Sequence, residues 1–154
     1  MEAVLILLVI GMLVGSWIIS GVVPTMIFYG LKIISPGIFL PAALILSLIV
    51  ALTTGNSWST AATIGIVLMG IGAGLGIPPQ ITTGAIISGA YMGDKLSPLS
   101  DTTNLAPAMA GSDIFEHIKA MLYTTIPSFI ITIILFIFIG RKYSDIGVDN
   151  RVIK

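Results

Sequence analysis

The chain contains no cysteine and very little charge. Its 154 residues include 7 Lys and Arg, 7 Asp and Glu and 1 His, so the formal net charge is +0. The absence of cysteine excludes disulfides, thiolate metal sites and cysteine nucleophiles. With neither a basic excess nor a basic stripe, we do not expect nucleic acid as a partner. Charged residues make up 9% of the sequence, whereas a soluble domain carries about 25%, so water would cover this surface poorly.

Apolar residues take the place of the missing charge. Hydrophobic residues make up 56% of the sequence, and the mean hydropathy is +1.09. Residues 33–93 contain no charged side chain. The composition predicts an all-α, multi-pass protein of the cell membrane, because a helix satisfies all its backbone groups within lipid. The lipid bilayer is therefore the first expected partner.

The first apolar segment covers residues 3–23 and is long enough for a membrane span, which needs about 20 residues. Glu2 precedes it instead of a basic residue, and no small-residue cleavage pattern follows promptly. We therefore expect a retained helix and not a signal peptide. Pro24 is expected to end or kink this helix. A short helix over 25–34 and a turn over 35–37 should follow.

Two further apolar arms, 38–52 and 61–77, are joined by the uncharged polar stretch 53–60. Each arm is at or below the length needed to cross a bilayer. One interpretation is a re-entrant helical hairpin, which is tolerated where protein or water surrounds its tip. The other is two ordinary spans joined by an outside loop, and length alone leaves both open. The alternating glycines of the second arm indicate close helix packing or a hinge.

A helix broken by polar residues is expected next. Residues 80–92 and 102–110 predict two half-helices, and the polar stretch 93–104 lies at their junction. A charged group in hydrocarbon costs at least about 2.5 to 3.5 kcal/mol on insertion scales, so charges between apolar helices usually have a use. Interrupted apolar segments are the best sequence indication of a transport site.

The last membrane segment is expected over residues 122–140, with a kink at Pro127 and an end at Arg141 and Lys142. Before it, Asp113 and Glu116 fit a helix-capping box, and residues 113–120 should form a short amphipathic helix at the membrane surface. Residues 143–154 read as a polar tail. The chain is thus predicted to contain one membrane domain, 1–142, and a tail, 143–154.

The polar residues of the hairpin tip and of the broken helix are the candidate site. Sodium needs several oxygen ligands, and an ionisable carboxylate can exchange a proton for the ion. We expect ion binding or proton coupling by Asp101, Thr102, Thr103, Asn104, Asp94, Asn56 and Ser57, supported by Lys95, Ser97, Ser100, Ser59 and Thr60. Asp101 and Asn104 are the first choice as sodium ligands. No resident cofactor is implied, only sodium and protons as cargo. The two sets are expected to converge near the middle of the membrane.

Simpler explanations exist for several of these residues. Asp101 could serve only as the N-cap of a half-helix that begins at Thr102. Lys95 could merely neutralise a carboxylate, and Ser97 and Ser100 could satisfy the backbone of a turn. His117 is expected to be a solvated surface residue, although imidazole can also sense protons near neutral pH. No arrangement of nucleophile, base and acid is evident, so we do not expect an enzyme.

Residues 93–107, GDKLSPLSDTTNLAP, resemble the NhaC-type sodium/proton antiporters. Shorter strings fit the same pattern: 23–27 (VPTMI), 54–58 (TGNSW), 84–91 (GAIISGAY), 117–118 (HI) and 121–125 (MLYTT). The resemblance implies secondary active transport by two inverted repeats, each with a re-entrant hairpin and a broken helix. Residues 38–77 would be the hairpin of the second repeat, and 80–110 its broken helix.

Members of that family are much longer, and this chain resembles only their C-terminal part. The resemblance therefore implies a missing N-terminal repeat, supplied by a separate chain or by self-association. A split subunit, a truncated reading frame and an inactive remnant or assembly subunit all stay open. Some relatives exchange malate and lactate with sodium and protons. No arginine within the apolar segments is available to bind an organic acid, which weighs against that alternative.

Overall fold

The computed structural model describes residues 2–144, and each secondary-structure element in that range is an α-helix. The elements are α1 (Glu2–Ile19), α2 (Val22–Ile33), α3 (Pro36–Thr54), α4 (Ser57–Ala62), α5 (Ile64–Gly74), α6 (Pro79–Leu96), α7 (Asp101–Ala110) and α8 (Ile114–Ser144). The expected all-α class is confirmed.

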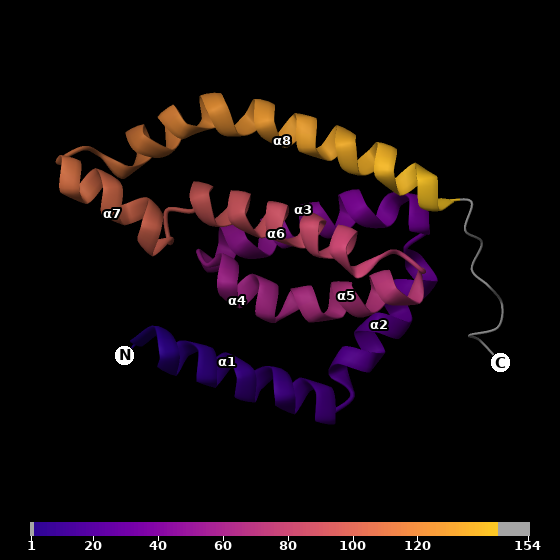
Figure 1. Cartoon of the computed structure of the whole chain (residues 1–154). Helices are drawn as coiled ribbons and strands as arrows, with labels where there is room; N and C mark the ends of the chain where they lie inside the picture. Colours follow the sequence, from indigo (N-terminus) through magenta and orange to yellow (C-terminus); the bar gives the residue numbers. More distant parts are fainter. Residues whose placement is uncertain (1, 145–154) are drawn as a thin grey trace, which may run out of the picture.

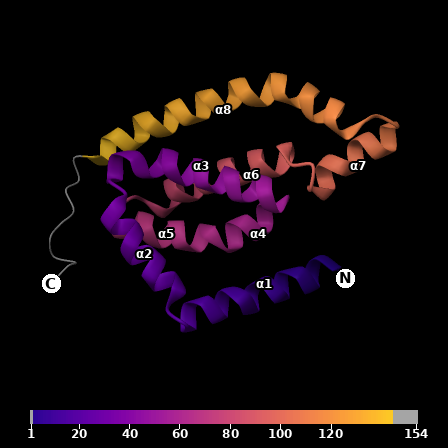
Figure 2. The ribbon, with the colours of Figure 1, turned by 180° about the vertical axis from the view of Figure 1, so that it is seen from behind.

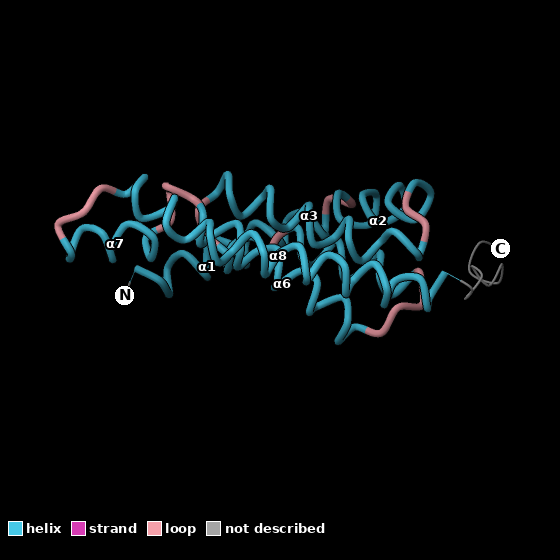
Figure 3. The backbone as a smooth tube through the Cα atoms, turned by 90° about the horizontal axis from the view of Figure 1, so that it is seen from above, coloured by secondary structure: helices cyan, strands magenta, loops and turns pink. Residues whose placement is uncertain are grey.

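The helices stack in layers (Figure 1). The long α8 arches over α3 and α6, α4 and α5 lie beneath these, and α1 forms the outermost layer on the far side. The same order is seen from behind (Figure 2), and the view from above shows a narrow, elongated slab (Figure 3). The most extensive helix pair is α3 with α6, followed by α3 with α8. The core therefore lies around α3, where Phe39, Leu40 and Leu44 are fully buried.

Among the described residues, two helices are long and apolar enough to cross a membrane. They are Pro36–Thr54 and Ile114–Tyr143, each with a mean hydropathy of 2.3. A third span results if Leu8–Ile19 and Val22–Ile33 count as one helix bent by 68°. Only 6% of the apolar window of α8 is buried in the chain, so this helix needs lipid or another protein segment around it.

The first helix breaks earlier than expected. The expectation of a break at Pro24 is wrong, because α1 ends at Ile19 and α2 begins at Val22. Gly21 has the positive φ of 80° that lets the chain turn there. Pro24 sits in the first turn of α2, where a missing backbone N–H breaks no helical hydrogen bond.

The two apolar arms form a helical hairpin. Its tip is Gly55, whose φ of 68° ends α3, and Asn56, whose side chain accepts a hydrogen bond from the N–H of Ser59 at 3.0 Å to cap α4. The returning arm contains a break that the sequence analysis did not predict, at Thr63, which separates α4 from α5. The expected turn over 35–37 is also shorter, since α3 already begins at Pro36.

Glycines allow close packing on two sides of the hairpin. A methyl group at Gly70 or Gly74 would collide with Ile27 or Leu31 of α2, which agrees with the expected packing role of the alternating glycines. On α6, Gly89 and Gly93 lie against backbone carbonyls of α3. This contact brings the end of α6 close to the tip of the hairpin.

The broken helix and the last helix both differ from their expected bounds. α6 continues through Asp94 and Lys95 to Leu96, so the non-helical break covers only 97–100, whereas the expected half-helices, 80–92 and 102–110, left 93–101 between them. Asp113 caps α8 as expected, accepting from the N–H groups of Phe115 at 2.8 Å and Glu116 at 3.2 Å. α8 is one continuous helix that passes Arg141 and Lys142. It ends at Ser144, and residues 145–154 of the expected tail lie outside the described range.

Candidate functional site

The tip of the hairpin and the break in α6–α7 meet at one carboxylate. Ser57, the first residue of α4, donates to Oδ2 of Asp94 from its backbone N–H at 3.2 Å and from its hydroxyl at 2.7 Å. Ser100, at the end of the break, donates its hydroxyl to Oδ1 of Asp94 at 2.5 Å. The half-buried carboxylate of Asp94 is thus held by both elements.

Backbone contacts fix this junction. The hydroxyl of Ser97 donates to the carbonyl of Leu52 at 2.8 Å, which ties the break to the last turn of α3. Gly55 lies against the backbone of Leu99, where a Cβ atom would be 2.6 Å from the Leu99 carbonyl carbon. The tip can approach the break only because residue 55 has no side chain.

Beside Asp94 lies a cavity of about 150 Å³, here called the polar cavity, whose walls combine polar side chains with Trp58 and Tyr91. Its lining includes six of the residues selected from the sequence: Asn56, Ser57, Asp94, Ser100, Asp101 and Thr102. Two carboxylates, three hydroxyls and one amide are the ligand types that hard cations prefer. Residues 2–144 hold no group of three His, Asp or Glu side chains that could bind a metal ion.

Other selected residues shape the backbone around this cavity. The buried Thr103 hydroxyl donates to the carbonyl oxygens of Asp94 at 3.3 Å and Lys95 at 3.0 Å. Asn104 donates its amide to the carbonyl oxygens of Pro98 at 2.7 Å and Ser100 at 2.8 Å. Both side chains bind the ends of the broken helix and do not line the cavity.

The remaining predicted residues hold the hairpin tip. Ser59 and Thr60 donate their hydroxyls to the backbone carbonyl of Asn56 at 3.1 and 2.8 Å. Asp101 is exposed and is the first residue of α7, whose N-cap position is Ser100. The simpler alternative, in which Asp101 serves only as the N-cap of a half-helix that begins at Thr102, is therefore wrong by one residue.

A second cavity, of about 320 Å³, lies on another side of Asp94. Its ionisable lining residues are Tyr91, Asp94, Lys95 and His117. His117 is half-buried at the wall of this cavity, and its expected contact with water stays a prediction. Met121 of α8 lines the same cavity. Sequence reasoning missed this placement because it depends on how α8 packs against α6 and α7.

Trp58 and Tyr91 are the other residues that sequence reasoning missed. Both line the polar cavity. Residue type alone gives little indication of this, because exposed aromatic residues in membrane proteins usually serve as interface anchors. The available signal was their spacing in the sequence, since Trp58 directly follows Ser57 and Tyr91 lies about one helical turn before Asp94.

A hairpin tip that meets a broken helix at a polar site is an arrangement typical of ion-coupled membrane transporters. Residues 89–151 match the model of the Na+/H+ antiporter family. The chain belongs to the NhaC-type sodium/proton antiporter family. No solved structure matches it.

Three curated relatives illustrate the similarity. The chain is 53% identical over 149 residues to the malate-2H(+)/Na(+)-lactate antiporter of Bacillus subtilis, covering 97% of this chain and 32% of that protein. It is 52% identical over 141 residues to the Na(+)/H(+) antiporter NhaC of Alkalihalophilus pseudofirmus, covering 92% and 30%. It is 51% identical over 154 residues to an uncharacterized Na(+)/H(+) antiporter of Haemophilus influenzae, covering 99% and 33%. The chain thus spans about one third of the length of these relatives.

Proposed function

We propose that the chain forms part of a sodium/proton antiporter of the cell membrane, in which Asp94 binds either a sodium ion or a proton. The observation that carries this proposal is the convergence of Ser57 and Ser100 on the Asp94 carboxylate. Two elements far apart in sequence each donate a hydroxyl hydrogen bond to one acidic side chain beside a polar cavity. Such an acidic group within a membrane protein is a transport-site candidate by default.

Exchange follows from the chemistry of this carboxylate. A sodium ion in the cavity would gain its charge partner from Asp94 and further oxygen ligands from Asn56, Ser57 and Thr102, which line the same space. A proton bound to Asp94 removes the negative charge that holds the ion. A sodium ion and a proton therefore exclude each other at this site. Each time the site changes its exposure from one side of the membrane to the other, it carries either a sodium ion or a proton. Asp101 adds a second negative charge to the cavity wall.

The polar cavity favours a cation over an organic acid. Asp94 and Asp101 would both repel a carboxylate substrate, while Lys95 lines the cavity on the other side of Asp94. This charge arrangement supports sodium/proton exchange over malate/lactate exchange. The intact contacts at the site also weigh against an inactive remnant.

The partners of the chain in a complete transporter are part of the same proposal. Because the chain spans about one third of its relatives, we propose that an N-terminal repeat or a second copy completes the multi-pass protein. The outer face of α8 is available for such a neighbour. In this assembly the chain acts as a transporter subunit and not as an enzyme.

A chimera tests the proposal. The chain replaces its aligned segment in the NhaC antiporter of Alkalihalophilus pseudofirmus, with which it shares 52% identity. The chimera is reconstituted in vesicles, and sodium-driven pH change is followed with a dye. We expect antiport from the chimera and no antiport from its Asp94→Asn variant. In Asp101→Asn, the sodium concentration for half-maximal antiport should rise about tenfold, because one nearby negative charge is lost.

Asp113→Asn is the matched control, because this carboxylate is exposed and caps α8 away from the cavity. It should leave the sodium requirement unchanged. The proposal fails if the chimera is inserted in the membrane but gives no sodium-driven pH change, or if Asp94→Asn transports as well as the parent.

A further inference from the structure

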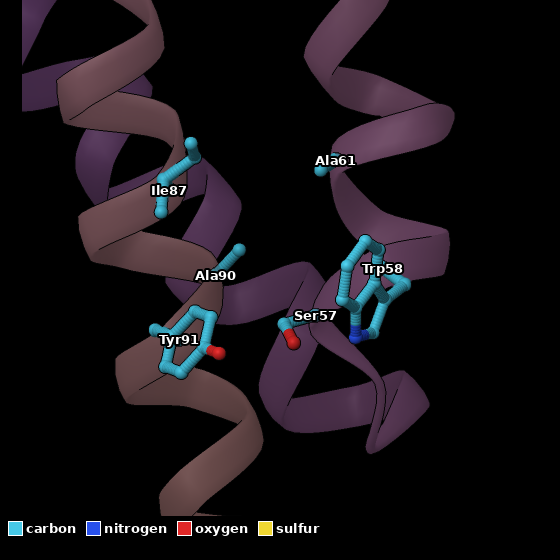
Figure 4. A pocket seen from close by; sticks show the side chains of 6 residues that line it. All are labelled: Ser57, Trp58, Ala61, Ile87, Ala90 and Tyr91. Atoms are coloured by element: carbon cyan, nitrogen blue, oxygen red, sulfur yellow. The ribbon is translucent and has the colours of Figure 1, made fainter.

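A third cavity adjoins the polar one between α4 and α6. It measures about 190 Å³ and is lined by Ser57, Trp58, Ala61, Ile87, Ala90 and Tyr91 (Figure 4). Trp58 and Tyr91 stand on opposite sides of it, with Ser57 between them. Their side chains are 70% and 63% exposed, so both rings are accessible to a ligand.

The walls of this cavity are apolar apart from the polar atoms of Ser57, Trp58 and Tyr91. Ala61 and Ala90 leave space because they end at Cβ. Apolar cavities of about 150 Å³ bind benzene in other proteins. The space therefore suits an aromatic ring or a short alkyl chain.

This apolar cavity shares three wall residues with the polar one. Ser57, Trp58 and Tyr91 line both spaces. The polar end of the combined site carries Asp94 and Asp101, and aromatic faces also attract cations. A ligand that fills both parts therefore needs a positive head group and an apolar tail.

We propose that the chain carries a binding site for a small organic ammonium ion, with its charged group beside Asp94 and Asp101 and its apolar group between Trp58 and Tyr91. Sodium competes with this ligand, because both need the same carboxylates. The inference shares Asp94 with the proposed function, but binding requires no transport and is measured separately.

Fluorescence of Trp58 provides the measurement. In the full chain with Trp17→Phe, Trp58 is the remaining tryptophan of the 2 in the sequence. The protein in detergent is titrated with benzylammonium, methylammonium and benzoate at neutral pH. We expect saturable quenching by benzylammonium, a need for about tenfold more methylammonium, and no saturable change with benzoate. Sodium should raise the benzylammonium concentration needed for half-saturation.

Two variants separate the parts of the site. Ala61→Leu fills the apolar cavity and should weaken benzylammonium about tenfold while changing methylammonium less than about twofold. Asp94→Asn should weaken both ammonium ions. Ile66→Leu moves a methyl group on the exposed part of α5, away from the cavity, and is the control. It should change the binding of neither ammonium ion.

The inference is overturned if benzoate binds as well as benzylammonium, if sodium does not compete, or if Ala61→Leu affects both ammonium ions equally. Ammonium binding together with an inactive chimera would support the inference and contradict the proposed antiport. An active chimera whose chain ignores benzylammonium would contradict the inference alone.

Discussion

The hydroxyl of Ser57 lies 2.7 Å from Oδ2 of Asp94, although the two residues are 37 positions apart in the chain. The backbone N–H of Ser57 reaches the same oxygen at 3.2 Å. One residue at the start of a six-residue helix thus joins the hairpin tip to the broken helix. A movement of the hairpin tip would therefore change the hydrogen bonds that Asp94 receives.

Replacing Ser57 by alanine should weaken sodium binding while keeping the fold. A hydrogen bond to a charged group contributes about 1.5 to 3 kcal/mol, and the backbone N–H of residue 57 still reaches Asp94. We expect the sodium concentration for half-maximal antiport in the chimera to rise about tenfold. Ser59→Ala is the control, since that hydroxyl donates only to the carbonyl of Asn56 at 3.1 Å and to no acidic group. Equal effects of the two variants would contradict a specific role for Ser57.

The two glycines Gly55 and Gly111 offer a test of the contact between tip and break. Both have φ of 68°, so alanine is strained equally at either position. A Cβ at Gly55 would lie 2.6 Å from the backbone of Leu99, whereas at Gly111 nothing lies within 4 Å. Gly55→Ala should abolish antiport by the chimera. Gly111→Ala should leave antiport intact and lower the unfolding temperature, because the backbone strain costs about 1 kcal/mol of stability. The idea fails if both variants transport equally.

The approximate positions of the helices were predictable because hydrophobic segments and polar interruptions are local patterns of the sequence. The residues that end the helices were less predictable, and proline was the misleading signal. Pro41, Pro107 and Pro127 all lie inside helices. The break after α1 occurs instead at Gly21, whose positive φ only the folded chain reveals.

The composition of the candidate site was predictable, but the relative places of its carboxylates were not. Asp101 stands in the densest run of oxygen-bearing residues, which made it the first choice. Asp94 is nevertheless the acid that receives hydrogen bonds from both Ser57 and Ser100. This difference arises because α6 continues past Asp94 and packs against α3 through Gly89 and Gly93, and such long-range packing leaves no local pattern in the sequence.

The packing of α6 on α3 should depend strongly on Gly89. An alanine there would place its Cβ against the carbonyl oxygen of Leu44. Backbone atoms cannot move aside as a flexible side chain can, so we expect Gly89→Ala to cost about 1 to 3 kcal/mol of stability. Gly84→Ala is the control on the same helix, because its Cβ would lie 3.7 Å from Phe136, an ordinary contact. Thermal unfolding in detergent measures both, and equal unfolding temperatures would contradict the tight α3–α6 contact.

Ser47 should be the one core serine whose removal stabilises the chain. Its side chain is 0% exposed, and its hydroxyl has no hydrogen-bond partner among the described residues. A buried hydroxyl without a partner costs about 1 to 3 kcal/mol, so Ser47→Ala should raise the unfolding temperature in detergent. Ser97→Ala is the matched comparison: this hydroxyl is equally buried but donates to Leu52 at 2.8 Å, and its loss should lower the unfolding temperature. Both substitutions remove a serine hydroxyl from a buried position. Only the presence or absence of a hydrogen-bond partner therefore predicts that the two unfolding temperatures change in opposite directions. A fall in the unfolding temperature of Ser47→Ala would contradict the prediction, because it would show that this hydroxyl has a hydrogen-bond partner in the detergent-solubilised protein.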